Sequence, residues 1–175
     1  DDVCDGVVKK LLYRHPHVFG DGQAETADTV PASWEQLKRQ EKGQKTTADA
    51  LDAVARSLRG LWRAEKIQKK AAEAGFDWRD VSGALDKLDE ETAELRQAVR
   101  DGTNVEEELG DVLFAAVKVG RFCGVDPETA VNGTCEKFIR RFRAMEEAAA
   151  AEGRSLSDMT LEEMTALWNG AKECS

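Results

Sequence analysis

The chain has 175 residues, of which 41% are hydrophobic and 34% are charged, and its formal net charge is −9. This length suits one substantial domain, and the composition is that of a folded protein rather than of a disordered chain. No apolar run approaches the roughly 20 residues that cross a bilayer, and no basic stripe suits a nucleic acid. We therefore expect neither membrane nor nucleic acid as a partner, and an anionic ligand would need a divalent cation beside it.

Helix signals begin near the N-terminus, and strand signals are almost absent. A short helix is predicted from about Asp5 to Arg14, before a segment over 15–31 that contains Gly20, Gly22 and Pro31 and is expected to be a loop or linker. A capping box of Ser33 and Gln36 predicts a helix to about residue 42. Residues 43–60 are expected to be a flexible connection with room for one helical turn.

The rest of the chain predicts longer helices whose ends are marked by capping residues and glycines. Leu85, Leu88, Leu95 and Val99 follow one another at spacings of three, seven and four, which places them on one helix face. Short connections between long amphipathic helices favour an all-α antiparallel bundle. The expected helices are 61–74 before Gly75, 79–100 before Gly102, 105–123 between an Asn104 cap and Gly124, 127–152 after the Asp126 cap with Pro127 in its first turn, and a last helix after Thr160 and Glu163.

Acidic side chains recur at helical spacing on two neighbouring predicted helices. Glu91 and Glu94 are three residues apart on the first helix, and Glu108 and Asp111 are three apart on the second, so each pair shares a face. In an antiparallel pair the four carboxylates would form an oxygen-only site, which suits Mg²⁺ or Mn²⁺ rather than zinc. Gly110 inside the second helix costs about 1 kcal/mol relative to Ala, which favours a packing or site reason for it. The alternative is a solvated acidic face without a metal.

The cysteines and histidines form no recognisable metal motif. The cysteines are far apart and include no CxxC pair, so we expect reduced thiols, packed as small hydrophobic residues, in a cytoplasmic protein. The two histidines are distant in sequence from the acidic motifs and are expected to be structural or linker residues. These residues are Cys4, Cys123, Cys135, Cys174, His15 and His17.

Several sequence motifs resemble those of the MazG nucleotide pyrophosphohydrolases. EExxE at 90–94 is followed by ELGD at 108–111, in the order of that family. KIQKKAAEAGFDW at 66–78 is similar to the segment before the family's acidic helix, and EKFIRRF at 136–142 resembles its later basic motif. RHPHVFGD at 14–21 is similar to the junction after the first of two domains in longer members. The resemblance covers nearly the whole chain.

This resemblance implies an all-α NTP pyrophosphatase fold, a homodimer, and Mg²⁺-dependent hydrolysis of a nucleoside triphosphate to its monophosphate and pyrophosphate. Residues 1–31 would be the end of a preceding MazG-like domain with its linker, and 32–175 the catalytic domain. Glu90 or Glu91 would accept a proton from the water that attacks the α-phosphorus. The implied metal ligands are Glu91, Glu94, Glu108 and Asp111, and the implied nucleotide-binding residues are Lys38, Lys87, Glu90, Asp111, Lys137, Arg141 and Trp168.

The cationic and aromatic candidates each have a structural alternative. Lys87 lies one turn before Glu91 and either holds a phosphate or only pairs with that carboxylate. Lys137 and Arg141 are four residues apart, and they either bind a phosphate together or pair with acidic residues on the surface. Trp168 either stacks on a base or belongs to the core.

One position departs from the family pattern, and two other functions stay open. Cys135 stands where the family usually has Asn, and a thiol is a poorer hydrogen-bonding group than an amide. The chain could instead be a non-catalytic acidic helical interaction module. It could also be a relative within the same superfamily that prefers dUTP or dCTP.

Overall fold

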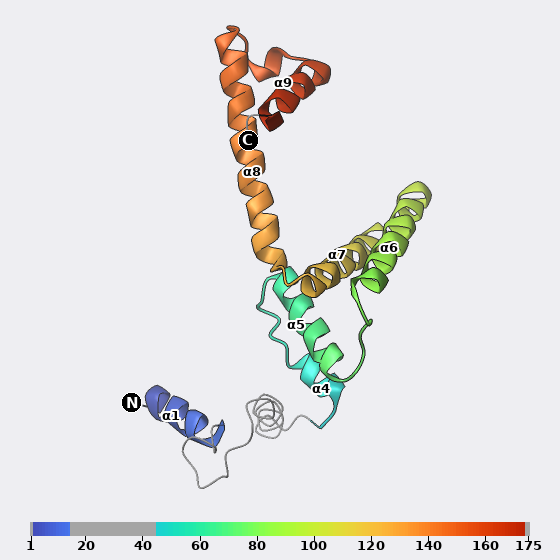
Figure 1. Ribbon diagram of the computed structural model, residues 1–175, viewed down its shortest axis with the longest axis vertical. Coiled ribbons are helices and arrows are strands. Elements are labelled where there is room, and N and C mark those ends of the chain that lie inside the picture. Colours follow the sequence, from blue (N-terminus) through green and yellow to red (C-terminus); the bar gives the residue numbers. More distant parts are fainter. Residues whose placement is uncertain (1, 15–44, 174–175) are drawn as a thin grey trace. The chain divides into compact units, whose positions relative to one another are not determined.

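The computed structural model describes residues 2–14 and 45–173, and these residues form helices without any strand (Figure 1), which confirms the predicted all-α class. The predicted linker over 15–31 and the helix expected after Ser33 lie outside the described residues. The helices are α1 (Asp2–Arg14), α4 (Thr47–Asp52), α5 (Gly60–Glu73), α6 (Val81–Asp101), α7 (Val105–Phe122), α8 (Pro127–Ala151), the 3₁₀ turn η1 (Leu156–Asp158) and α9 (Leu161–Glu173).

The described residues fall into two compact units. One comprises 2–14, 45–58 and 66–77, and the other comprises 59–65 and 78–173. The second unit contains α6 to α9 and therefore both acidic motifs. None of the described helices is long and apolar enough to span a membrane.

The first unit contains a short helix in the segment where the sequence left room for one helical turn. The Thr46 hydroxyl accepts a hydrogen bond from the Asp49 N–H at 3.1 Å, and the Asp49 carboxylate accepts one from the Thr46 N–H at 2.8 Å. This reciprocal capping box begins α4, which lies in the segment expected to be a flexible connection with room for one helical turn. The Thr-x-x-Asp spacing was the available signal, and Ala50 and Val54 are buried beside it.

In the second unit, α6 and α7 form an antiparallel pair because a three-residue connection reverses the chain. Asp80 caps α6 by accepting a hydrogen bond from the Ser82 N–H at 2.9 Å. Gly102, with φ of 69°, ends α6 in the left-handed conformation. Asn104 is the N-cap residue of α7, as predicted, but it is left-handed, with φ of 53°, and its side chain makes no capping hydrogen bond. Asn tolerates the left-handed conformation better than most residues, which suits Asn104 to the end of this short connection.

The buried face of α6 differs from the face that the large apolar residues suggested. The buried residues of α6 are Ala84, Glu91 and Ala98, each seven positions from the next, and the two alanines allow a neighbouring backbone to approach closely. Leu85 and Val99, expected on the packed face, are 45% and 61% exposed. The packed face of α6 thus buries two small side chains and one carboxylate, and it leaves large apolar side chains such as Leu85 and Val99 exposed.

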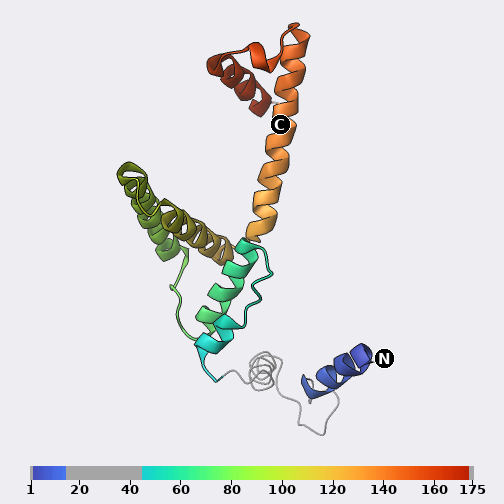
Figure 2. The same ribbon diagram turned by 180° about the vertical axis from the view of Figure 1, so that it is seen from behind.

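The predicted boundaries of α8 and α9 are confirmed by their caps. Asp126 accepts a hydrogen bond from the Thr129 N–H at 2.7 Å, and Pro127 occupies the first turn of α8. Thr160 and Glu163 form a capping box at the start of α9. α9 folds back against α8 (Figure 2), where Met145 is buried.

The described cysteines were expected to be packed as small hydrophobic residues, and that expectation is wrong. Cys4, Cys123 and Cys135 are free thiols with exposed side chains. Cys174 lies outside the described residues.

Candidate metal and nucleotide site

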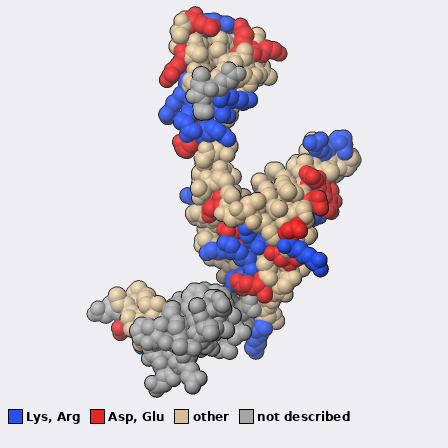
Figure 3. Space-filling model, viewed as in Figure 1, with Lys and Arg blue, Asp and Glu red and all other residues tan. Residues whose placement is uncertain are grey.

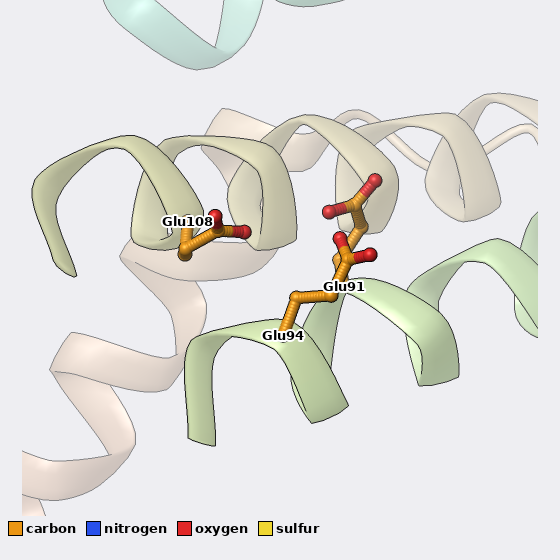
Figure 4. Close-up of side chains that lie close together, drawn as sticks. All are labelled: Glu91, Glu94 and Glu108. Atoms are coloured by element: carbon orange, nitrogen blue, oxygen red, sulfur yellow. The ribbon is translucent and has the colours of Figure 1, made fainter. Parts of the chain in front are cut away.

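Three carboxylates converge between α6 and α7. Glu91 and Glu94 lie one turn apart on α6, and Glu108 comes from the first turn of α7 (Figure 4). One oxygen of each carboxylate lies within 4.8 Å of the others, the one such group of three in the described part of the chain. Two oxygens on opposite sides of one Mg²⁺ are about 4.2 Å apart, because each Mg–O distance is about 2.1 Å. Small rotations of flexible Glu side chains would therefore close this group on a cation.

The three carboxylates differ in burial and influence one another. Glu91 is 7% exposed, Glu108 is half-buried and Glu94 is exposed. A hydrogen bond with Glu91 raises the pKa of Glu94, and partial burial and the negative charge of Glu91 act in the same direction. A raised pKa means that adding a further negative charge here is unfavourable. A divalent cation would remove that penalty, so the donor set fits a hard metal ion.

Lys87 already neutralises part of this charge. Its Nζ lies 2.8 Å from Oε1 of Glu90 and 2.7 Å from Oε1 of Glu91. The hydrogen bonds to Glu90 and to Glu91 raise the pKa of Lys87, so it carries its positive charge at neutral pH. The pairing that the sequence left as the alternative to phosphate binding is present.

Two acidic residues of the predicted site lie outside the converging group. Asp111 lies one turn beyond Glu108 on α7 with an exposed side chain, and its carboxylate is not among the three that meet. Glu90 is more than half exposed and contacts Lys87 rather than the other carboxylates. Spacing alone had suggested that all four metal candidates converge, and the structure brings three of them together.

The basic and aromatic candidates lie on α8 and α9. Lys and Arg side chains gather along part of α8 (Figure 3). The sequence of α8 carries Lys137, Arg140, Arg141 and Arg143 in one stretch. Nε of Arg141 is buried and has no hydrogen-bond partner among the described residues. Trp168 is half-buried, and its ring centroid lies 4.9 Å from that of Phe138. A guanidinium group can donate hydrogen bonds to an anionic group, and aromatic rings offer a face on which a planar ring can stack.

Phe138 also lies in this region, although the sequence did not single it out as a nucleotide-binding residue. It contacts Trp168 on one side, and its centroid lies 6.1 Å from that of Phe142 on the other. Phe138 follows Lys137 directly, so the available signal was the alternation of basic and aromatic residues in that motif. Lys38 lies outside the described residues.

Comparison with known proteins places these helices in a family. The model of the MazG nucleotide pyrophosphohydrolase domain matches residues 79–145, which include α6, α7 and most of α8. The nucleoside triphosphate pyrophosphohydrolase of Escherichia coli (strain K12) is 45% identical over 176 residues, covering 98% of this chain and 67% of that protein. A Thermotoga maritima protein named nucleoside triphosphate pyrophosphohydrolase/pyrophosphatase MazG is 38% identical, covering 98% of this chain and 65% of its own length.

A third relative carries no assigned activity. The uncharacterized protein YabN of Bacillus subtilis (strain 168) is 46% identical over 176 residues, which is 99% of this chain but 36% of that protein. The alignments thus extend over nearly the whole chain, and the matched domain holds the three converging carboxylates. On this evidence the chain belongs to the MazG nucleotide pyrophosphohydrolase family.

Proposed function

We propose that the protein hydrolyses a nucleoside triphosphate to the monophosphate and pyrophosphate with the help of Mg²⁺. The observation that carries this proposal is the convergence of Glu91, Glu94 and Glu108 on one point between two helices. Oxygen-only donor sets suit Mg²⁺, and Mn²⁺ has the same preference. The names of the E. coli and T. maritima relatives support the same reaction.

The three converging residues would hold the metal, and Asp111 would join them when nucleotide is bound. The bound cation would polarise phosphate oxygens and lower the pKa of a coordinated water. Lys87, Lys137 and Arg141 would neutralise charge on the phosphates. Trp168 would stack on the base, while Lys38 is proposed as a further substrate contact on the resemblance alone.

We assign the proton acceptor to Glu90 rather than to Glu91. Glu91 is 10% exposed at its side chain and belongs to the metal group, whereas the Glu90 side chain is 57% exposed and can reach a water molecule. Water would attack the α-phosphorus, its proton would pass to Glu90, and pyrophosphate would leave. Release of Lys87 to the phosphates would free Glu90 for this role.

The test is a panel of ribo- and deoxynucleoside triphosphates, incubated with purified protein and Mg²⁺ and assayed for monophosphate and pyrophosphate. We expect both products, and a preference confined to dUTP or dCTP would indicate the more specific relative.

Glu91→Gln keeps the shape of the side chain without its charge and should lower kcat/KM at limiting Mg²⁺ by at least about 100-fold. Glu107→Gln, the same change beside Glu108 but outside the group, is the control.

The opposite result would leave the interaction module as the better interpretation. That module predicts no turnover with any triphosphate and no Mg²⁺ binding by the free protein. Full activity of Glu91→Gln at limiting Mg²⁺ would remove Glu91 from the metal site even if the reaction itself is found.

We also infer that the protein is a cytoplasmic homodimer. Val105, Leu109 and Leu113 are four residues apart along α7 and are 38%, 47% and 49% exposed. We call these three residues the α7 stripe. An uncovered row of large apolar side chains supports burial against a second copy, as the family resemblance implies. The exposed free thiols of the described cysteines suit a reducing compartment.

A further inference from the structure

The ammonium group of Lys87 lies where it competes with a metal for the same carboxylate. Its Nζ is 2.7 Å from Oε1 of Glu91, and Glu91 also supplies one of the three oxygens that converge within 4.8 Å. A Mg²⁺ ion would approach that carboxylate to about 2.1 Å. Two cations of total charge three would then share one buried carboxylate and repel each other.

This pairing is not explained by helix stabilisation. A Lys placed four residues before a Glu has the less favourable orientation for a helical pair, and exposed pairs contribute little. Glu91, however, is 7% exposed, and a buried carboxylate without a cation is strongly unfavourable. Lys87 therefore supplies the charge compensation that Glu91 needs when no metal is bound.

We propose that Lys87 acts as a built-in competitor of the metal, so that the free protein binds the divalent cation weakly until a triphosphate draws Lys87 away from Glu91. This inference rests on the proposed metal site. The triphosphate offers Lys87 new oxygen partners, and the vacated carboxylate then binds the cation more tightly. Metal and nucleotide would thus favour each other's binding, as linkage requires.

The first test measures Mn²⁺ binding to the free protein by calorimetry. Lys87→Met keeps the length of the side chain without its charge and should bind Mn²⁺ about tenfold more tightly than the wild type, within the usual range of coupling between sites. Lys87→Arg, which retains the positive charge, should keep the weak affinity.

The matched control is Arg96→Met, which removes one positive charge from the same helix. Arg96 lies nine residues beyond Lys87, on the opposite face of α6, and is exposed. Its Mn²⁺ affinity should stay within about twofold of the wild type, because separated exposed charges are largely screened. An equal gain in both Met variants would overturn the proposal, since net charge alone would then explain it.

The second test measures the affinity for a triphosphate analogue with a non-hydrolysable α,β-bridge, with and without Mn²⁺. In the wild type, Mn²⁺ should strengthen analogue binding several-fold more than in Lys87→Met. A Lys87 that serves only to support the helix would leave this ratio unchanged. Circular dichroism of each variant serves as the control that its helices are retained.

Failure of this inference and failure of the metal site are distinguishable. If Glu91→Gln loses Mn²⁺ binding while Lys87→Met gains none, the site stands and the competition by Lys87 is refuted. If Glu91→Gln binds Mn²⁺ as tightly as the wild type, the metal site itself is refuted and this inference falls with it.

Discussion

Glu91 is a buried carboxylate that lies between an ammonium group and two further carboxylates. It contacts Lys87 at 2.7 Å and converges with Glu94 and Glu108. A helix one residue out of register would place a different side chain between α6 and α7, because successive residues are about 100° apart around the axis. The position of this one residue between two helices therefore decides whether the acidic motif can bind a metal.

Asp111 tests whether the site closes around its ligand. Because its carboxylate lies outside the converging group, Asp111→Asn should leave Mn²⁺ affinity of the free protein within about twofold of wild type. With a bound triphosphate analogue, the same variant should lose about tenfold in Mn²⁺ affinity, as expected for a lost ligand or its support. Calorimetry in both states makes the comparison, with Glu108→Gln weakening binding in both. A tenfold loss already in the free protein would contradict this two-step view.

The elements around the site are held by contacts at their ends. At the start of α6, a Cβ at Gly83 would lie 2.3 Å from Cδ1 of Trp78, whose ring centroid is 4.8 Å from Nζ of the buried Lys118. At the start of α9, Arg154 and Glu163 form an ion pair at 2.8 Å. The first contact joins the start of α6 to α7, and the second joins the segment after α8 to the first turn of α9.

Gly83→Ala should lower the free energy of unfolding by about 1 kcal/mol, since the Trp78 ring must leave Lys118 and its cation–π contact is lost. Gly133→Ala, inside α8 with nothing within 4 Å of an added Cβ, should instead raise it by up to about 1 kcal/mol through helix propensity. Urea unfolding of both variants measures the difference. Equal stabilisation by the two alanines would show that Trp78 does not restrict this position.

Glu163 makes the stability of α9 dependent on pH. The Arg154 guanidinium, followed by the Thr160 N–H, lowers the pKa of Glu163 from 4.5 to about 2. A carboxylate with a lowered pKa stabilises the fold above its unfolded value, and this contribution is lost as pH falls from about 4.5 towards 2. Glu163→Gln should therefore lower Tm at pH 7, and its difference from wild type should narrow over that range.

The control for this prediction is Glu162→Gln, which changes the neighbouring exposed side chain of the same helix. Its Tm should follow the wild type across the whole pH range, because surface substitutions away from specific contacts have small effects. A Tm difference for Glu163→Gln that stays constant between pH 7 and pH 3 would refute the link to ionisation.

At the scale of the whole molecule, the packing of α6 against α7 leaves large apolar side chains on both helices exposed. The α7 stripe is the most regular of these surfaces, with Leu85 and Val99 uncovered on α6. Burial of a Leu or Val side chain contributes about 1.5–3 kcal/mol, so several such residues favour association. The proposed homodimer would supply the cover that one chain lacks.

Leu113→Glu should convert the dimer to a monomer, because a charge placed in an apolar contact loses its hydration without a partner. Light scattering coupled to size exclusion, repeated over a range of protein concentrations, measures the mass. Leu161→Glu makes the same change at a residue of α9 that is 72% exposed, and it should remain dimeric. A wild-type mass of one chain at all concentrations would refute the dimer.

The sequence by itself determined the helices of the second unit and the identity of the acidic residues. Capping boxes, glycines after helices and the proline of α8 are local signals, because a helix end is stabilised by groups within a few residues of it. The acidic spacing likewise follows from helix geometry alone. The family resemblance added the reaction, which periodicity and spacing do not contain.

Only the tertiary structure decided which face of α6 is packed and which carboxylates meet. Leu85 and Val99 had the right spacing for a core, yet Ala84, Glu91 and Ala98 are buried instead. Burial depends on how closely two backbones approach, which is a property of the helix pair rather than of either helix. For the same reason the carboxylate of Glu108 belongs to the converging group and that of Asp111 does not. Two residues that share a face of one helix can lie at different distances from the neighbouring helix.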